Sequence, residues 1–577
     1  MMAHTDTNDN SERTAEMSNL FQWAWLAALL IIAAALRIHN TDSFSYNADE
    51  AMHIHMAEGS SISQVWQFSQ YEAHPPLGNL LRHYWMEISS EVWFVRSQSM
   101  LFGLALILLY YRIGLLIAGR PAAIVCATLV AFSHGAIIQS YVVRNYIAFL
   151  FFLSLGFYAY LHWRNNRRPA MLLAYMACGW LAVLTHFSGI FCILCIGVFE
   201  TIHLYRQKAP VRCHLQWALA NLSILLVAVA IYHAWQPILV PLKSYFVGFL
   251  EPLPQMVKNT LVYPYSTGDY MFPSHLFTSL LLPAMAAYAL LPRLILRKGT
   301  SVRPLIALAA LALLVGMALY FTQIYPPLGT RRNFWIFPLL VPVAGAVLGD
   351  ALEHICIRLL PTMTALRLPV IALIALIAGL ASYDAADRFH DGSEYAMPRK
   401  QSDTLGRYLE TLGPKDLIIT EKDDGIMLTN LYRVMGTDAF TGAHMSALAA
   451  YGNTHILFNP YYPRNYSRNV LLATLEEAQT GHMFDEVQRL VFLRMAWSRS
   501  PLNDLMTCDT LTKQLVGFPP FEPNHPMDSD YIYTRSAALM IVPKERFLSE
   551  VMAQDGKART CLDGKHDMVP GFMPPHY

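Results

Sequence analysis

The chain has 577 residues, of which 54% are hydrophobic and only 14% are charged. Soluble domains carry about 25% charged residues, so the composition excludes a purely soluble protein, a disordered chain and a small disulfide-rich scaffold. The net charge of +1 argues against nucleic acid as a partner, because nucleic-acid binding needs a concentrated basic surface.

The charged residues are unevenly distributed along the chain. Residues 385–577 contain 43 of them, about 22% of that segment, whereas residues 1–384 are only about 10% charged. We therefore expect the first two thirds of the chain to be embedded in a membrane and the last third to form a water-soluble domain.

Eleven segments are apolar and long enough to cross a bilayer, which takes roughly 20 residues. They are 20–38, 97–117, 121–140, 147–163, 170–185, 187–204, 215–235, 275–296, 303–321, 334–350 and 368–383. This pattern predicts a polytopic α-helical membrane protein with about 11 transmembrane helices. Its predicted parts are a tail (1–19), a transmembrane module (20–384) with an external loop (40–95), and an external domain (385–577).

The distribution of Lys and Arg predicts the orientation, because cytoplasmic loops are enriched in these residues. Alternate loops, such as 164–168, 206–212 and 293–303, are basic, whereas the loop 40–95 is rich in acids. We expect a multi-pass protein of the cell (inner) membrane with a cytoplasmic N-terminus. An odd number of spans then places the C-terminal domain in the periplasm or outside the cell.

The predicted external domain alternates strand-like and helical patterns. Strands are expected at 417–420, 455–458, 490–493 and 538–542, and helices at 402–412, 424–434, 468–479 and 502–515. Such alternation is typical of a small α/β layer structure. The segment has no glycine-rich phosphate loop and no nucleophile elbow, which favours a lid or acceptor-docking domain over a second active site.

Two of the eight cysteines, Cys508 and Cys561, lie in this external domain. In an oxidising compartment a single disulfide between them is a natural hypothesis. Sequence spacing alone does not establish the geometry that such a bond requires.

The carboxylates point to an enzyme rather than a transporter. Transporters and channels place ionisable residues near the midplane of their spans, but the predicted spans contain almost no acids. Acids gather instead in the loop 40–95, where Asp49 and Glu50 are adjacent. Two neighbouring carboxylates on a helix cannot point the same way, so we expect one to face a cavity and the other to make a structural bond.

The same segment raises the question of a metal site. Asp49 and His53 are four residues apart, and Glu58 is three residues beyond His55, so helical pairs could act as ligands. A metal site needs three or four convergent ligands, whereas His53 and His55 lie on different faces of a helix. We expect no metal and no required cofactor, and a divalent metal is the less favoured alternative.

A second motif in this loop is His74-Pro75-Pro76. The two prolines impose an extended backbone and then begin a helix. This arrangement would give the His74 side chain a defined direction, in either a structural turn or a binding site.

Taken in order, these motifs resemble the lipid-linked-sugar glycosyltransferases of the GT-C superfamily, in particular the protein O-mannosyltransferases and the lipid A aminoarabinose transferases. The resemblance rests on Asp49-Glu50 after the first span and on His74-Pro75-Pro76-Leu77. Three further stretches and a looser fourth agree with it: Val95-Arg96-Ser97-Gln98-Ser99, Ser140-x-x-x-Arg144-x-Tyr146, Thr185-His186, and Gly329-Thr330-Arg331-Arg332-Asn333-Phe334 with Pro338.

The sequence also departs from these families. Aminoarabinose transferases carry Lys where this chain has His74 and have more membrane helices, and the Trp-Trp-Asp signature of oligosaccharyltransferases is absent. Residues 385–577 resemble no family that would identify the acceptor.

The resemblance implies a polyprenyl-phosphate sugar as the donor and a hydroxyl of a protein, lipid or glycan as the acceptor, at the outer face of the membrane. Asp49, with Glu50 beside it, would be the catalytic carboxylate that removes the acceptor proton. A phosphate leaving group needs no acid partner, in contrast to glycoside hydrolysis. A single displacement would invert the configuration at the anomeric carbon.

The donor phosphate needs a fixed cation, and an Arg guanidinium can bind two phosphate oxygens at once. Candidates are Arg331 and Arg332 at a helix entrance, for which snorkelling to lipid headgroups is the alternative, and Arg144, which could instead orient a carboxylate. His74 and His186 are candidates for hydrogen bonds to phosphate or sugar. Tyr146 is a further candidate, with a place in the interfacial aromatic belt as its alternative.

Three other functions stay open at this point. A transporter or flippase for a lipid-linked sugar predicts charged residues in the spans and tolerates loss of Asp49. An oligosaccharide ligase would move a whole glycan from a diphosphate lipid. An inactive relative would serve as an interaction scaffold.

Overall fold

The computed structural model describes two groups of residues, one helical and one built around a sheet. The described residues are 6–38, 41, 46, 48–70, 74–247, 253–272, 278, 299–322, 331–382, 405–421, 447–451, 454–459, 475–476, 478–480, 482, 484–494, 508, 511, 513–517 and 538–553. At some of them, including Asp49, Arg331 and Arg332, only the backbone is described.

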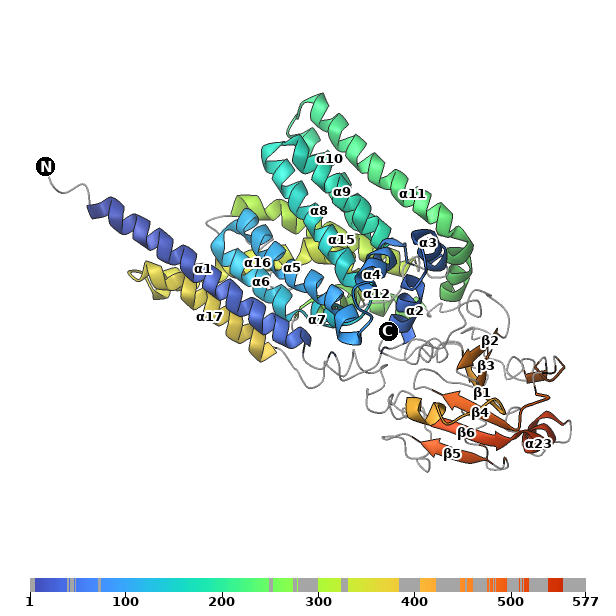
Figure 1. Ribbon diagram of the computed structural model, residues 1–577. Helices are drawn as coiled ribbons and strands as arrows, with labels where there is room; N and C mark the ends of the chain where they lie inside the picture. Colours follow the sequence, from blue (N-terminus) through green and yellow to red (C-terminus); the bar gives the residue numbers. More distant parts are fainter. Residues whose placement is uncertain are drawn as a thin grey trace.

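Long helices form the first group, and short helices lie between its first two spans (Figure 1). The short helices are α2 (Ala48–Ala57), α3 (Ile62–Ser69) and α4 (Leu77–Met86). The long ones are α1 (Asp6–Ile38), α5 (Val92–Ala118), α8 (Tyr146–Asn166), α9 (Pro169–Thr185), α10 (Gly189–Arg206), α11 (Val211–Val247), α12 (Leu253–Met271), α15 (Gly299–Phe321), α16 (Phe337–Leu359) and α17 (Thr364–Ser382).

Most of the predicted spans correspond to helices of the structure. Among the described residues, 8 helices are long and apolar enough to cross a membrane, and they correspond to eight of the eleven predicted spans. The predicted span 170–185 is the helix α9, which at 17 residues falls short of that length criterion. The predicted span 275–296 lies outside the described residues except at Thr278.

The predicted span 121–140 is a broken helix. It consists of α6 (Arg120–Phe132) and α7 (His134–Tyr141), which are bent by 54° relative to one another, so the two together count as at most one further span. Ser133 separates them and caps α7, because its side chain accepts a hydrogen bond from the Ala136 N–H. The bend was not expected, although Ser133-His134-Gly135 interrupts the apolar run at this point.

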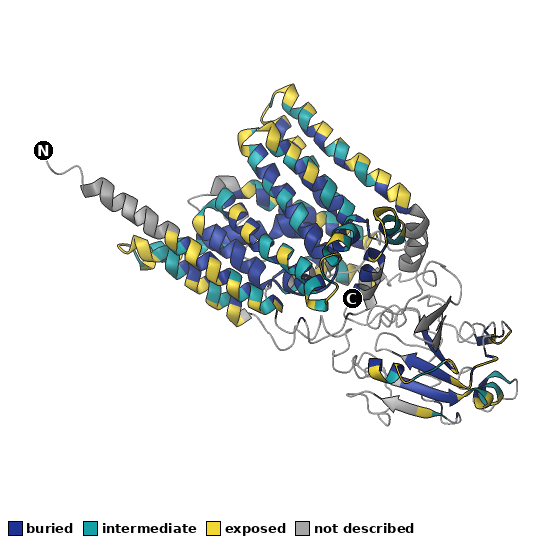
Figure 2. Ribbon diagram, viewed as in Figure 1, coloured by how far each residue is buried: buried dark blue, intermediate teal, exposed yellow. Residues whose placement is uncertain are grey.

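Small residues bring α6 and α16 together at the centre of the helical part, where Figure 2 shows buried ribbon. A Cβ at Gly345 would lie 2.2 Å from Cys126 Sγ, and a Cβ at Gly349 would lie 2.6 Å from the Ala122 nitrogen. Glycines four residues apart allow two helix backbones to approach closely in a membrane, where packing drives association. The helices α6 and α16 are therefore tightly packed against one another at the centre of the helical part.

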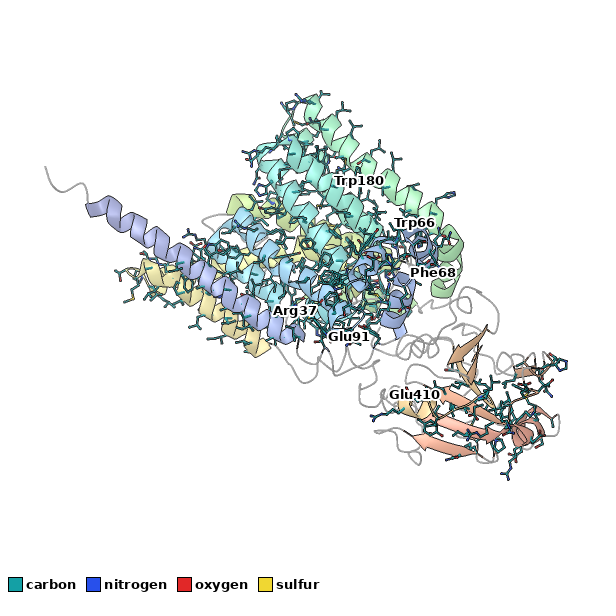
Figure 3. The ribbon with its side chains drawn as sticks, viewed as in Figure 1. Arg37, Trp66, Phe68, Glu91, Trp180 and Glu410 are labelled. Carbon is teal, nitrogen blue, oxygen red and sulfur yellow. The ribbon has the colours of Figure 1, made fainter. Side chains whose placement is uncertain are left out.

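A buried arginine satisfies the backbone at the α6–α7 bend. Arg37, near the end of α1 (Figure 3), donates to the carbonyls of Val130 and Ala131 at 3.3 and 3.2 Å and to Ser140 Oγ at 3.1 Å. The last carbonyls of a helix have no intrahelical partner, and a cation is favourable at that end of the helix dipole. Arg37 thus compensates for the interruption of the helix and ties α1 to α7.

The second group of residues is a six-stranded sheet with the order β2-β3-β1-β4-β6-β5. Its strands are β1 (Asp416–Glu421), β2 (Ala447–Tyr451), β3 (Thr454–Asn459), β4 (Arg489–Arg494), β5 (Gln514–Gly517) and β6 (Ala538–Pro543). Strands β3 and β4 both run parallel to β1. The edge strand β2 pairs antiparallel with β3, and β6 pairs antiparallel with β4 and with the other edge strand, β5. The α/β character and the four predicted strands are confirmed.

Alternate residues of the three strands β1, β4 and β6 bury one face of this sheet. Its core contains Leu417, Ile419, Leu490, Phe492, Met540 and Val542, which follows from the period of two in a strand. The strands β2 and β5 were not expected, and the predicted helix at 502–515 is wrong where the structure describes it, because Gln514 begins β5 and Cys508, Leu511 and Lys513 are not helical.

The cysteines of the helical part and of the sheet domain differ in their bonding state. The six cysteines of the helical part are free, whereas Cys508 is disulfide-bonded and packs in the core of the sheet. Its predicted partner, Cys561, lies outside the described residues, so the pairing stays a prediction.

We expect Arg37→Met to lower the free energy of unfolding by about 1–3 kcal/mol, because it leaves buried carbonyls at the α6–α7 bend without their donor. Unfolding of the purified protein in detergent micelles would measure the loss. The control is Arg112→Met, the same change at an exposed position on α5, for which we expect at most about 0.5 kcal/mol. Equal effects of the two substitutions would contradict this role of Arg37.

Candidate active site

Four side chains from three separate segments meet beside the short helices that follow the first span. His74 precedes α4, Arg144 and Tyr146 lie at the junction of α7 and α8, and His186 lies in the turn between α9 and α10. The His74 and His186 ring centroids are 5.0 Å apart, and those of Tyr146 lie 5.4 and 5.1 Å from them. The Arg144 guanidinium carbon lies 5.7 Å from the centre of the Tyr146 ring. Four of the residues singled out in the sequence are therefore neighbours in space.

The local sequence explains how His74 is held. Pro76 is the N-cap of α4, as the two prolines predicted, and His74 is buried. Its Nε2 lies 3.3 Å from the Tyr146 hydroxyl, within hydrogen-bonding distance. Gly78 lets α4 pack directly on the α7–α8 junction, since a Cβ there would lie 2.1 Å from Asn145 Oδ1.

Of the adjacent carboxylates Asp49 and Glu50, Glu50 makes the structural bond that the sequence led us to expect. Its two oxygens accept hydrogen bonds from Arg96 Nε and Nη2 at 3.0 and 2.9 Å, and Oε1 also accepts from the Val143 N–H at 2.9 Å. Glu50 is 1% exposed and Arg96 is 4% exposed. A bidentate, fully desolvated pair with a third donor gives Glu50 a positioning role rather than the role of a free base.

Arg96 also holds the chain that leads into α2. It donates to the Thr41 carbonyl, and its guanidinium carbon lies 5.3 Å from the centre of the Tyr46 ring. Burial raises the pKa of the Tyr46 hydroxyl well above its ordinary value, so this phenol stays neutral. In the sequence, Arg96 stands out only as part of a motif. An arginine directly before an apolar span and after an acid-rich loop is the signal that would have found it.

Asn79 is the centre of a second polar network, which no sequence motif predicted. Its Nδ2 donates to Ser69 Oγ at 3.0 Å, and its Oδ1 lies 3.0 Å from both Arg82 Nη1 and His53 Nδ1. Arg82 also donates to Asn145 Oδ1 at 3.3 Å. The network connects α2, α3 and α4 to the segment that carries Arg144 and Tyr146.

The hydrogen bonds set the proton positions on two histidines. His186 Nδ1 lies 3.1 Å from the Ser188 N–H, which can only donate, so in the neutral ring the proton sits on Nε2. Asn79 Oδ1 can only accept, so His53 must donate from Nδ1. These tautomers follow from the network rather than from observed hydrogens.

For the remaining predicted residues, Asp49, Arg331 and Arg332, the structure describes the position of the backbone. Asp49 lies in the first turn of α2, immediately before Glu50. Arg331 and Arg332 begin η1 (Arg331–Ile336), the 3-10 turn that leads into α16. Trp335 of η1 packs on Phe191 at 5.6 Å between ring centroids, close to the α9–α10 turn that carries His186. Within the described residues, no group of three His, Cys, Asp or Glu side chains is arranged to hold a metal ion.

We expect Glu50→Gln to lower the free energy of unfolding by about 3–5 kcal/mol, because it leaves the buried Arg96 guanidinium without its counter-charge. The double variant Glu50→Gln, Arg96→Gln should lose less than the sum of the single losses. Denaturation in detergent would measure each value, with Glu91→Gln, the same change at an exposed position, as the control. Additive losses would contradict the pairing.

Comparison with known proteins gives one family match. Residues 61–246 match the model of the dolichyl-phosphate-mannose-protein mannosyltransferase family. This segment contains His74, Arg144, Tyr146 and His186 but not Asp49, Glu50, Arg331 or Arg332. A comparison with curated protein sequences gives no match.

Solved structures share the fold over most of the chain. ArnT from Cupriavidus metallidurans, in the apo state, matches with a TM-score of 0.54 and 13% identity over 90% of this chain and 98% of that chain. The same protein bound to undecaprenyl phosphate gives a TM-score of 0.52 at 13% identity, with the same coverage. The archaeal oligosaccharyltransferase AglB from Archaeoglobus fulgidus, in complex with an inhibitory peptide and a dolichol-phosphate, gives a TM-score of 0.50 and 14% identity over 92% of this chain and 77% of that chain.

At these identities the structural matches establish the fold, and the family model carries the link to chemistry. The GT-C resemblance inferred from the motifs is confirmed, and the chain is a multi-pass membrane protein. Residues 61–246 thus match a mannosyltransferase family model, and over most of its length the chain shares the fold of ArnT and AglB.

Proposed function

We propose that this protein transfers a single sugar from a polyprenyl phosphate to an acceptor hydroxyl at the outer face of the membrane, with inversion at the anomeric carbon. The observation that carries the proposal is the meeting of His74, Arg144, Tyr146 and His186 beside the helix α2, which carries Asp49. The solved structures of ArnT with undecaprenyl phosphate and of AglB with a dolichol-phosphate support a lipid phosphate as the donor group.

Asp49 is the proposed general base. It lies next to Glu50, whose carboxylate is committed to Arg96 and the Val143 N–H, so the two acids have separate tasks. As the acceptor oxygen attacks the anomeric carbon, Asp49 takes the hydroxyl proton and the bond to the phosphate breaks. Such general base catalysis contributes about 10²–10⁴-fold to the rate.

Arg144 is the proposed ligand of the donor phosphate within the cluster. Its guanidinium lies near Tyr146, and Glu50 accepts a bond from the neighbouring Val143 N–H, so the backbone that carries Arg144 is held in place. His186, which presents an Nε2–H donor, and His74 are proposed to bind the phosphate or the sugar. Arg331 and Arg332, at the start of η1, are proposed as a second contact to the phosphate.

The proposed topology follows from the basic loops. A cytoplasmic N-terminus puts the loop 40–95 and residues 385–577 on the outer side. In this arrangement the α/β domain is the proposed docking region for the acceptor, and no metal or cofactor takes part. The sugar and the acceptor class are left to the assay below.

Asp49→Asn should lower sugar transfer about 10²–10⁴-fold, because it removes the base without changing the size of the side chain. The wild type and the variant would be reconstituted in liposomes with a panel of radiolabelled polyprenyl-phosphate sugars and a cell-envelope extract as acceptor. Sugars on polyprenyl diphosphates complete the panel and test for a ligase. Equal transfer by wild type and a folded Asp49→Asn would exclude Asp49 as the base, and Glu91→Gln serves as the control that retains full activity.

Arg144→Gln should raise the KM for the donor about tenfold or more, because hydrogen bonds to a charged group contribute about 1.5–3 kcal/mol each. Arg144→Lys keeps the charge but not the bidentate geometry, so its KM should lie between those of the wild type and Arg144→Gln. Steady-state kinetics with varied donor and saturating acceptor would measure both. An unchanged donor KM in a folded Arg144→Gln protein would remove Arg144 from the phosphate site.

A further inference from the structure

Asn145 lies between two residues of the candidate site and carries a buried donor group. It directly precedes α8, between Arg144 and Tyr146 in the chain, and is only 1% exposed. Within the part of the chain that the structure describes, its Nδ2 has no hydrogen-bond partner. Buried polar groups in folded proteins are almost always hydrogen-bonded. The amide N–H group of Asn145 is therefore available to an acceptor atom of a ligand.

We propose that Asn145 is a specificity-determining residue, whose Nδ2 donates a hydrogen bond to a hydroxyl of the sugar carried by the lipid-linked donor. This inference rests on the proposed function, because it concerns the sugar whose phosphate Arg144 would bind. The pattern Ser140-x-x-x-Arg144-x-Tyr146 leaves position 145 open, so the sequence motif assigns no task to this residue.

The first support is that the Asn145 side chain does not cap its helix. Asn is favoured at an N-cap because its side-chain oxygen accepts a hydrogen bond from a backbone N–H of the first turn. Asn145 is the N-cap residue of α8, but its side chain makes no such bond, and its backbone is helical at φ −78° and ψ −12°. Capping therefore does not explain the position of this amide.

The second support is the orientation of the amide. Arg82 Nη2 donates to Asn145 Oδ1 at 3.3 Å. A guanidinium has only N–H donors, so the amide atom that faces it must be the oxygen. Turning the amide over would bring two donors together. The NH₂ group of Asn145 therefore occupies the edge of the amide that does not face Arg82 Nη2.

The third support is that the amide is held in place before any ligand binds. Arg82 also donates from Nη1 to Asn79 Oδ1 at 3.0 Å, and Asn79 donates to Ser69 Oγ at 3.0 Å. A Cβ at Gly78 would lie 2.1 Å from Asn145 Oδ1 and 2.7 Å from its Nδ2, so the amide packs directly against the backbone of α4. A donor that is already fixed loses little conformational entropy when its ligand arrives.

The fourth support is the different chemistry of Asn145 and Arg144. A phosphate group favours a cationic donor with two N–H groups in one plane, which is the task proposed for Arg144. The Asn145 amide is neutral, and a neutral donor suits an uncharged hydroxyl. The sugar is bonded directly to the phosphate, so the residue next to the phosphate ligand is well placed to reach its hydroxyls. On the other side of Asn145, the Tyr146 hydroxyl lies 3.3 Å from His74 Nε2.

Such a contact would make the protein selective among donor sugars. A site built to hydrogen-bond a substrate hydroxyl rejects an analogue that lacks it, because the buried polar group of the protein is then left unpaired. One hydroxyl of the donor sugar should therefore be required for efficient transfer, and this requirement should depend on Asn145.

An alanine substitution separates this contact from a structural role. Asn145→Ala removes the amide without adding a charge. Asn166→Ala is the matched control, because Asn166 is the exposed residue at the other end of α8. A structural loss lowers transfer from every donor by a similar factor, whereas loss of a contact to one hydroxyl affects only the donors that carry it.

Transfer would be measured for the full-length protein in liposomes, with the polyprenyl-phosphate sugar that supports transfer and its monodeoxy analogues. In the wild type, we expect kcat/KM for one analogue to lie about tenfold or more below that for the complete sugar. Asn145→Ala should lower kcat/KM for the complete sugar about tenfold and change that for this analogue by less than about twofold, so that the preference disappears. Asn166→Ala should keep the wild-type preference.

Inhibition by the free polyprenyl phosphate distinguishes a contact to the sugar from a contact to the phosphate. The free lipid phosphate carries no sugar, so its inhibition constant in Asn145→Ala should stay within about twofold of the wild-type value. An inhibition constant that rises as much as the donor KM would assign Asn145 to the phosphate and overturn the sugar contact.

The remaining outcomes are also distinct. A wild type that transfers the complete sugar and all its monodeoxy analogues equally well would overturn the inference without any variant and leave the proposed function intact. An equal loss for every donor in Asn145→Ala would make Asn145 a structural residue and overturn it in the same way. No transfer by the wild type from any donor in the panel would overturn the proposed function and the sugar contact together.

Discussion

The buried ion pair between Glu50 and Arg96 is the constraint on which the candidate site depends. It joins α2 to the first turn of α5, and through the Val143 N–H it reaches the segment between α7 and α8. Two desolvated charges are costly unless they are paired and fully hydrogen-bonded, so each of the three segments can occupy only one position relative to the others. The same contact fixes the helix that carries Asp49 and the loop that carries Arg144.

The broken helix α6–α7 shows how irregular backbone is accommodated within an apolar bundle. At membrane depth, backbone groups that lose their helical partners must find others inside the protein. Arg37 supplies donors to the carbonyls of Val130 and Ala131 from one side, and Glu50 accepts the Val143 N–H from the other. Small residues of α6 and α16 pack the centre. Two buried charged side chains thus hold the segment that leads to Tyr146 in place.

Much of the fold was predictable because long apolar runs have few alternatives in a chain of this composition. Eight of the expected spans correspond to helices of spanning length, and the four expected strands recur within β1, β3, β4 and β6. Each failure has its own cause. Strand β2, with three alanines in five residues, has little β-propensity, β5 is only four residues long, and the bend at Ser133 depends on a contact from Arg37, which is 96 positions away in sequence.

The sequence by itself determined the membrane class, the separate α/β domain and most candidate residues of the site, because hydropathy and short motifs are local properties. The tertiary structure decided which of those residues meet and what each side chain is committed to. Glu50 could not be separated from Asp49 by sequence, since its partners Arg96 and Val143 lie 46 and 93 positions away. His53 acquired a defined tautomer only through Asn79 and Arg82 on another helix. Hydrogen bonds between distant segments depend on packing, and packing is not encoded in the spacing of any one motif.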